Sequence, residues 1–451
     1  MLFAPFCGYI KINLHLKFMR SLVKLFPKSD YFQNVVTLIS GTVVSQAILI
    51  LASPVLTRIY TPSDFGILGI YLSLIAIIGV LATGQYEFAI LLPKKDDEAI
   101  NIVALCLMLI FIVTALFSIF LFLFPDLLGK YYIKEDYKEI LFFVPIGIVI
   151  VCSFRVHTFW LNRIKSYKML AFSRMFQSGS RVGLNIFFGL THLVINGLIW
   201  GYTLGFAFAN IVVCFFLWKT SRKSFKAISF FDIFSQAKNH INFPKFTISS
   251  NLIQTTTLNM PLILFPIAFG ATVSGFYVLT QRVTKIPLNM IAKSVGNVYR
   301  QKASQIYAEE GTCKEIFLST LKNLFVISIV PFGLLYIFAP YLFALLFGEQ
   351  WRISGEYTQI LIISYWIQFI VHPLSNTLLI AGKQKIHLVI QIISFMTIST
   401  AIYIGFRYGN IFLALILIVC ANCIKYILQL ILSYYYCEDM FIKKEKLALS
   451  K

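Results

Sequence analysis

The chain has 451 residues, of which 58% are hydrophobic and only 13% are charged, and its mean hydropathy is +0.80. Soluble domains carry about a quarter charged residues to cover their surface, so this composition excludes an ordinary cytosolic enzyme. The apolar residues also form many separate blocks, which excludes a single globular domain held by one anchor. We therefore predict an all-α polytopic integral membrane protein.

Spanning a bilayer as a helix takes about 20 predominantly apolar residues. Twelve segments meet this requirement, and each is expected to form one transmembrane helix. In chain order they cover residues 35–59, 65–88, 99–124, 140–161, 170–190, 195–218, 246–269, 274–298, 317–347, 357–381, 387–406 and 411–436.

A polar, basic segment separates the first six predicted helices from the last six. It gives five expected parts: an N-terminal cytoplasmic or interfacial segment (1–33), an N-lobe (34–218), a cytoplasmic connector (219–246), a C-lobe (247–436) and a cytoplasmic tail (437–451). Both halves place a proline in their first helix and an aromatic–glycine pair shortly after it: Pro54 before Phe65-Gly66, and Pro261 before Gly275-Phe276. This likeness indicates a parallel repeat, an arrangement that usually holds substrate between the two halves.

The basic residues decide the expected orientation. Lys and Arg number 39 against 19 Asp and Glu, which gives a net charge of +20. They lie in short segments between apolar blocks, so we expect a membrane role and no nucleic-acid partner. Most of them fall on the side that holds both termini and the connector, and Lys/Arg-rich loops are cytoplasmic. We expect both termini in the cytoplasm.

Eight basic residues fall inside predicted helices. For Arg155, Lys293 and Lys322, which lie near cytoplasmic helix ends, we expect the side chain to reach the interface. The others are Arg174, Arg181, Arg282, Lys285 and Lys425.

A cation deep in a bilayer costs a few kcal/mol and normally faces a polar interior where it has a function. Arg174 and Arg181 are seven residues apart, and Arg282 and Lys285 are three apart, so each pair is expected on one helix face. These cations either line a central cavity or serve as internal ion pairs and interface anchors. We favour the cavity.

The predicted membrane helices contain almost no acidic residues. Glu87 is the one acidic residue well inside a predicted helix, so the cavity should be electropositive and its ligand an anion. Glu87 is either the partner of an arginine or a proton-coupling carboxylate. Cys420 and Cys423 have CxxC spacing but lie in an apolar helix, and we interpret them as packing residues and expect no metal site.

Several motifs carry a family resemblance. They are LTRIYTPSDFG (Leu56–Gly66), YEFAILLP (Tyr86–Pro93), FWLNRIKSYKMLAFSRMFQ (Phe159–Gln177) and TQRVTKIPLNMIAKSVGNVYRQKAS (Thr280–Ser304). The chain resembles the polysaccharide-biosynthesis flippases of the multidrug/oligosaccharidyl-lipid/polysaccharide exporter (MOP) superfamily.

The resemblance implies a V-shaped bundle of two six-helix lobes around a cationic central cavity. It implies transport of undecaprenyl-pyrophosphate-linked oligosaccharide units across the bacterial inner membrane by alternating access, for the O-antigen of lipopolysaccharide or another surface polysaccharide. Arg58, Arg174, Arg282 and Glu87 fall in the matching motifs, so Arg58 joins the five cations above as a candidate substrate-binding residue of the cavity. The implied partners are the lipid-linked oligosaccharide and membrane lipids, with a polysaccharide polymerase and chain-length proteins as candidates. No cofactor is expected, and the sequence has no Walker A pattern for ATP.

Two alternatives differ from this interpretation. A cation-coupled drug or small-molecule exporter of the same superfamily would need membrane carboxylates beyond Glu87. A membrane polysaccharide polymerase or glycosyltransferase would need a large outer loop, whereas the longest one expected here covers only residues 125–139. We predict a transporter and not an enzyme.

Overall fold

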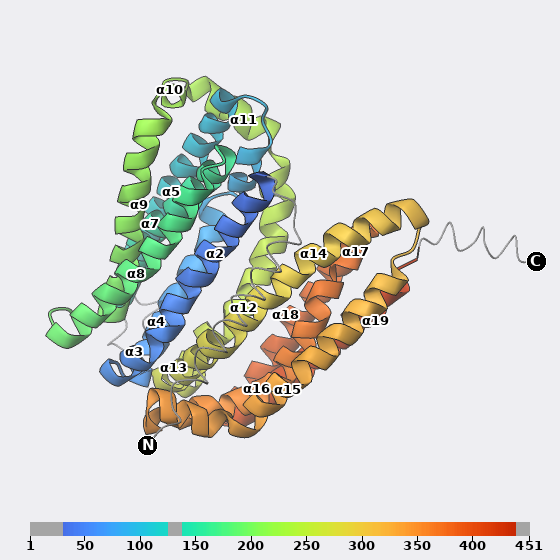
Figure 1. Ribbon diagram of the computed structural model, residues 1–451. Helices are drawn as coiled ribbons and strands as arrows, with labels where there is room; N and C mark the ends of the chain where they lie inside the picture. Colours follow the sequence, from blue (N-terminus) through green and yellow to red (C-terminus); the bar gives the residue numbers. More distant parts are fainter. Residues whose placement is uncertain (1–29, 125–137, 439–451) are drawn as a thin grey trace, which may run out of the picture.

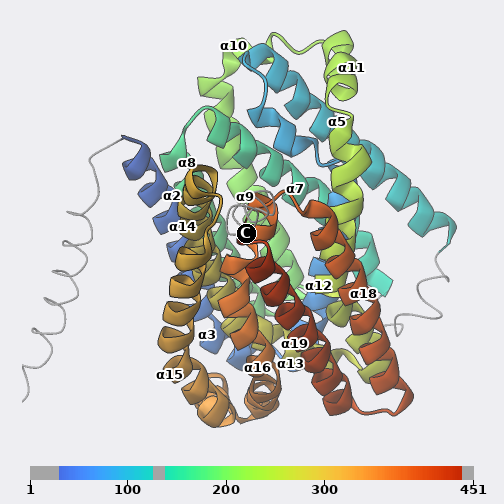
Figure 2. The same cartoon turned by 90° about the vertical axis from the view of Figure 1, so that its right-hand side faces the viewer.

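The computed structural model describes residues 30–124 and 138–438. The predicted segment 1–33 and tail 437–451 therefore lie almost wholly outside the described residues. The described part is helical, without a named strand, which confirms the all-α fold class. Figure 1 shows two bundles of helices that meet at one end and diverge toward the other, and Figure 2 shows the second bundle face-on.

Each bundle follows the chain order. The first contains α2 (Asp30–Leu51), α3 (Ser53–Ile59), α4 (Pro62–Ala82), α5 (Asp96–Leu123), α7 (Lys138–Arg163), α8 (Tyr167–Thr191) and α9 (Gly197–Thr220). Two short helices follow, α10 (Arg222–Phe225) and α11 (Phe230–Asn239). The second bundle contains α12 (Ile248–Phe269), α13 (Ala271–Thr280), α14 (Ile286–Glu310), α15 (Lys314–Phe347), α16 (Arg352–Leu374), α17 (Asn376–Ile380), α18 (Gln384–Arg407) and α19 (Ile411–Tyr435).

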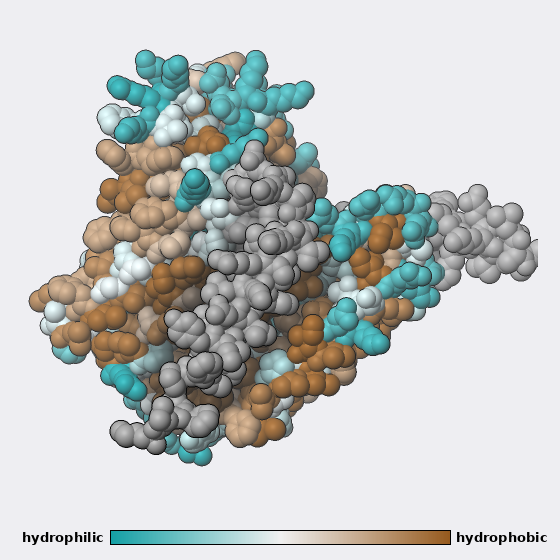
Figure 3. Space-filling model, in the orientation of Figure 1, coloured by the Kyte–Doolittle hydropathy of each residue, from teal (hydrophilic) through white to brown (hydrophobic). Residues whose placement is uncertain are grey.

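The surface and the helix lengths suit a membrane. Nine helices of the described part are long and apolar enough to cross one, and α8, α14 and α16 are not among them. On the face in Figure 3, hydrophobic side chains lie along both bundles, while hydrophilic ones gather mainly toward the ends of the bundles. The chain is a multi-pass membrane protein, and the number twelve stays a prediction.

The bundles touch most closely where α4 begins, and we call this place the closed end. Here α4 starts with a capping box between Thr61 and Asp64. A Cβ atom on Gly66 would overlap the carbonyl oxygen of Ala271, and one on Gly275 would overlap that of Pro62. The two aromatic–glycine segments that suggested a repeat thus lie against each other, and only glycine lets the backbones approach so closely.

A tryptophan adds a polar contact at the closed end. Trp351, in the 3₁₀ helix η5 (Glu349–Trp351), is fully buried, and its indole N–H donates a hydrogen bond of 3.0 Å to the carbonyl oxygen of Thr57. Its ring packs edge-on against Phe65 of α4 and Phe276 of α13. The closed end is therefore a packed junction between the bundles.

Glycines also join α8 to α9. A Cβ atom on Gly205 of α9 would lie 2.8 Å from the Cα atom of Arg181 on α8, closer than van der Waals contact permits. Gly201 and Gly205 form a G-x-x-x-G motif, which lets membrane helices pack backbone to backbone. This contact sets the position of Arg181 along α8 relative to α9.

Two predicted helices are interrupted. The segment 65–88 stops being α-helical at Ala82, because Gly84 and Gln85 adopt positive φ angles of 59° and 58°. Glu87 therefore lies in the 3₁₀ helix η1 (Tyr86–Leu91), which corrects its expected place inside the spanning helix. The segment 274–298 is divided into α13, the π-helix η4 (Gln281–Lys285) and α14.

Candidate functional site

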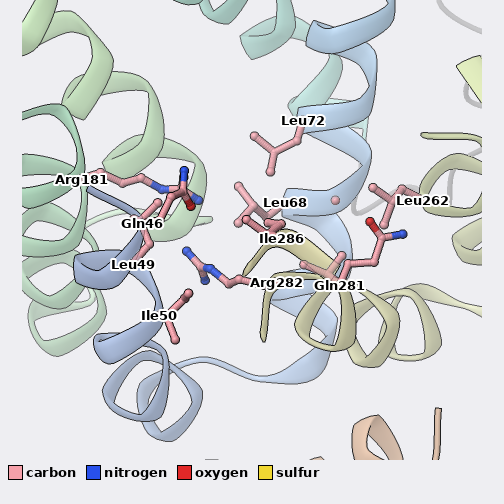
Figure 4. A pocket seen from close by; sticks show the side chains of 12 residues that line it. Gln46, Leu49, Ile50, Leu68, Leu72, Arg181, Leu262, Gln281, Arg282 and Ile286 are labelled. Atoms are coloured by element: carbon pink, nitrogen blue, oxygen red, sulfur yellow. The ribbon is translucent and has the colours of Figure 1, made fainter. Parts of the chain in front are cut away.

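A cavity of about 150 Å³ lies between the two bundles, and each bundle contributes one arginine to it. Figure 4 shows the Arg181 and Arg282 side chains extending from opposite sides into this space. The lining comes from α2, α4, α8, α12, α13, η4 and α14: Gln46, Leu49, Ile50, Leu68, Gly69, Leu72, Arg181, Leu262, Val278, Gln281, Arg282 and Ile286.

Both arginines are buried, and each guanidinium lies near an aromatic ring. Arg181 is 8% exposed, and its guanidinium lies 4.6 Å from the centre of the Tyr202 ring on α9. Arg282 is also 8% exposed, and its guanidinium lies 5.9 Å from the centre of the Phe65 ring. A cation over an aromatic face is attracted by the ring, so these contacts hold the two charged groups in place.

The guanidinium groups keep unused hydrogen-bond donors. Among the described residues, Nε of Arg181 and both Nη atoms of Arg282 are buried without a hydrogen-bond partner, and neither side chain forms an ion pair. None of the described residues that line the cavity is acidic. A buried charge without a partner is costly, so the cavity is suited to an anion that accepts these bonds.

Two neutral polar residues also line this cavity, and they were not predicted from the sequence. Gln46 on α2 and Gln281 on η4 line it, and Nε2 of Gln281 is buried without a partner in the described part of the chain. The sequence does contain a signal for them, because a glutamine inside an apolar membrane helix costs free energy unless its amide forms a hydrogen bond. The cavity offers amide donors as well as guanidinium groups.

The other predicted cations lie elsewhere. Arg174 is half-buried, and its Nη1 donates a 2.6 Å hydrogen bond to the hydroxyl of Thr42 on α2. Arg58 is exposed in the last turn of α3 at the closed end. Lys285 and Lys425 line a second cavity inside the second bundle. The structure thus brings together Arg181 and Arg282, and it separates the remaining four from them.

The expected pairing of Arg282 with Lys285 is wrong for a geometric reason. Both residues lie in η4, and the wider turn of a π-helix does not place residues three apart on the same face as an α-helix does. Arg282 therefore enters the cavity between the bundles, while Lys285 enters the second one.

Glu87 has an arginine partner. The carboxylate is fully buried, and its Oε1 lies 3.5 Å from Nη1 of Arg155 on α7. Of the two interpretations of Glu87, the structure shows the ion pair, and Arg155 is a partner of this carboxylate and not simply a side chain reaching the interface. Neither residue lines the cavity between the bundles.

Comparisons with known proteins agree with this architecture. Residues 55–355 match the family described as polysaccharide biosynthesis protein. Over 167 residues the chain is 26% identical to the teichuronic acid biosynthesis protein TuaB of Bacillus subtilis (strain 168), a match that covers 37% of this chain. The match spans about a third (34%) of the length of that relative.

The solved structures share the fold. An inward-facing multidrug resistance MATE family transporter of the MOP superfamily is similar with a TM-score of 0.70 and 15% identity, over 87% of this chain and 94% of that one. Lipid II flippase MurJ in an inward closed conformation is similar with a TM-score of 0.69 and 13% identity, over 89% of this chain and 87% of that one. An outward-facing MATE transporter of the MOP superfamily is similar with a TM-score of 0.56 and 14% identity, over 90% of this chain and 95% of that one. The chain belongs to the polysaccharide biosynthesis protein family, and it shares the fold of these solved transporters.

Proposed function

We propose that this protein is a flippase for undecaprenyl-pyrophosphate-linked oligosaccharide units, moving them from the cytoplasmic to the outer leaflet of a bacterial inner membrane by alternating access. The observation that carries the proposal is the pair of buried arginines, one from each bundle, whose donors have no partner among the described residues. The membership in a polysaccharide biosynthesis family supports the class of cargo.

The chemistry of such a substrate fits the cavity. A pyrophosphate is a multiply charged anion, and arginine offers planar, forked donors that bind phosphate oxygens at two points. Leucine and isoleucine side chains surround Arg181 and Arg282, and the low polarity there strengthens each charged contact. The polyprenyl tail can remain in lipid between the diverging bundles while the sugars follow the cavity.

The proposed orientation places the closed end outside the cell. The connector with α10 and α11 lies at the opposite end of the first bundle (Figure 1), and it carries the basic residues Arg222, Lys223 and Lys226. By the positive-inside rule that end is cytoplasmic. The greater similarity to an inward-facing than to an outward-facing transporter supports the same direction.

Topology reporters test this orientation. We expect a reporter fused after Lys226 to be active in the cytoplasm, and one inserted near Gln350 to be active outside, because the basic connector is retained inside. Alkaline phosphatase and green fluorescent protein fusions measure the two sides. An extracytoplasmic signal after Lys226 would contradict the proposed direction of transport.

The substrate itself is tested with a matched pair of lipids. If Arg181 and Arg282 bind the pyrophosphate, then Arg181→Ala and Arg282→Ala should slow flipping of neutral and acidic lipid-linked oligosaccharides equally. The loss should be at least about tenfold, because one charge-assisted hydrogen bond contributes roughly 1.5–3 kcal/mol. Flipping is measured in proteoliposomes that contain the purified variants.

The same assay separates the competing explanations. Loss with the acidic lipid alone would show that the arginines recognise the sugars. Full activity of both variants with the neutral lipid would contradict recognition of pyrophosphate by this pair. Arg58→Ala, at an exposed position outside the cavity, is the matched arginine control and should leave both rates nearly unchanged.

A further inference from the structure

A second cavity lies inside the second bundle, among α12, α13, η4, α16, α18 and α19. Its volume is about 30 Å³, and it shares no lining residue with the cavity between the bundles. The side chains that matter for its chemistry are two lysines, three tyrosines and two amides: Lys285, Lys425, Tyr277, Tyr365, Tyr426, Gln368 and Asn422.

The charged residues that line this cavity are all positive. Lys285 and Lys425 line the same small cavity. Within residues 30–124 and 138–438, neither ammonium group makes an ion pair or a hydrogen bond, and none of the residues that line the cavity is acidic. Two like charges in the apolar interior of a bundle need a negative partner to remain charged.

The surroundings favour charged ammonium groups and offer a further donor. The Nζ atom of Lys285 lies 5.8 Å from the centre of the Tyr365 ring, and that of Lys425 lies 5.3 Å from the centre of the Tyr426 ring. Such contacts stabilise the cation and not the neutral amine. The hydroxyl of Tyr365 is buried without a hydrogen-bond partner in the described chain, so it is free to donate to an anion.

The size of the cavity limits what binds. A cavity of 30 Å³ has room for only a few water-sized particles. A single halide ion is the best match to that space, and a phosphate group or a sugar carboxylate is larger. We propose that the second bundle binds a small inorganic anion of the halide class between Lys285 and Lys425, separately from the transported substrate.

The π-helix connects this anion to the substrate cavity. Arg282 and Lys285 lie three residues apart in η4 and point into the two different cavities. An anion beside Lys285 neutralises a positive charge next to the arginine that meets the substrate. The site therefore lets a halide change the electrostatic potential at Arg282 without entering the transport route.

The test uses the purified full-length protein without lipid-linked substrate, so its outcome does not depend on the proposed function. Thermal unfolding is measured at constant ionic strength in sodium chloride, sodium bromide, sodium phosphate and sodium gluconate. We expect chloride and bromide to raise the unfolding temperature above its value in gluconate, because a ligand that binds only the folded state stabilises it. Phosphate stabilises proteins without binding, so its effect should be the same in the wild-type protein and in the lysine variants. Lys285→Gln and Lys425→Gln should each weaken the apparent chloride affinity at least about tenfold, the size expected for one charged contact.

The controls keep the proposal falsifiable. Lys293→Gln and Lys322→Gln, at exposed positions on α14 and α15, should retain the full response to chloride. Tyr365→Phe should weaken the response while retaining both charges. Equal unfolding temperatures of the wild-type protein in all four salts would overturn the proposal, as would an unchanged chloride response in both lysine variants.

A second measurement covers variants that fail to fold. Crystals of the wild-type protein grown in sodium bromide should show an anomalous peak between Lys285 and Lys425. A bromide peak beside Arg181 and Arg282 alone would assign the anion to the substrate cavity and refute a separate site. Stabilisation by phosphate that is lost in Lys285→Gln and Lys425→Gln, without any response to the halides, would also refute the proposed preference for a small anion.

Discussion

Arg282→Ala is expected to abolish export of the surface polysaccharide while the protein remains in the membrane at its normal level. Both Nη atoms of Arg282 are buried and without a partner among the described residues, so removing the side chain breaks no hydrogen bond at those atoms. In the proposed function these donors meet the pyrophosphate, and losing two charge-assisted bonds costs roughly 3–6 kcal/mol of binding. The measurement is the amount of polysaccharide on cells that carry the variant in place of the wild-type gene, with membrane abundance measured by immunoblot.

Two further variants make that result specific. Arg282→Lys should rescue only part of the export, because lysine supplies a point charge without the forked geometry of arginine. Lys322→Ala, exposed on α15, should be nearly silent. If Arg282→Ala and Lys322→Ala behave alike, the cavity between the bundles has no role in transport.

Gly275→Val is the second change with a large expected effect, because it acts on the closed end. A Cβ atom on Gly275 would overlap the carbonyl oxygen of Pro62, which is backbone and cannot turn away. The bundles would have to separate there, so we expect flipping to fall to near background and the cavity to become reachable from outside. A membrane-impermeant thiol reagent should then label a cysteine at Leu68 from outside in Gly275→Val, but not in the otherwise wild-type protein.

A glycine in an open place provides the control. A Cβ atom on Gly333 of α15 would have no neighbour within 4 Å outside its own helical turn, so Gly333→Val should leave both labelling and transport unchanged. Labelling of the Leu68 cysteine is compared with the background from the native cysteines. A Gly275→Val protein that excludes the reagent and transports normally would contradict the role given to the closed end.

Much of the fold could be predicted from the sequence, because hydropathy depends on local composition. Every predicted segment overlaps a described helix, and the basic connector at 219–246 coincides with α10 and α11. The division of segment 65–88 was harder to predict. It depends on the left-handed backbone of Gly84 and Gln85, which leaves no trace in the hydropathy.

The candidate site could be predicted only in part. Charge counting indicated that Arg181 and Arg282 are costly to bury and therefore matter, but it gave no way to tell which cavity each cation enters. That choice depends on the π-helix η4, which redirects Lys285, and on Gly205, whose contact sets the position of Arg181. Such helix irregularities and close helix contacts arise from tertiary packing. The G-x-x-x-G pair in α9 was the one signal in the sequence that pointed to this contact.

The ring of Phe65 has a mechanical consequence. The Phe65 ring contacts two groups. The guanidinium of Arg282 lies over it, and the ring of Trp351 packs against it with the two ring centres 5.1 Å apart. Trp351 in turn is bonded across the closed end to Thr57. Under the proposed function, a pyrophosphate that draws the guanidinium away from Phe65 should loosen the packing of that ring against the indole, so Phe65 would couple substrate binding to release of the closed end.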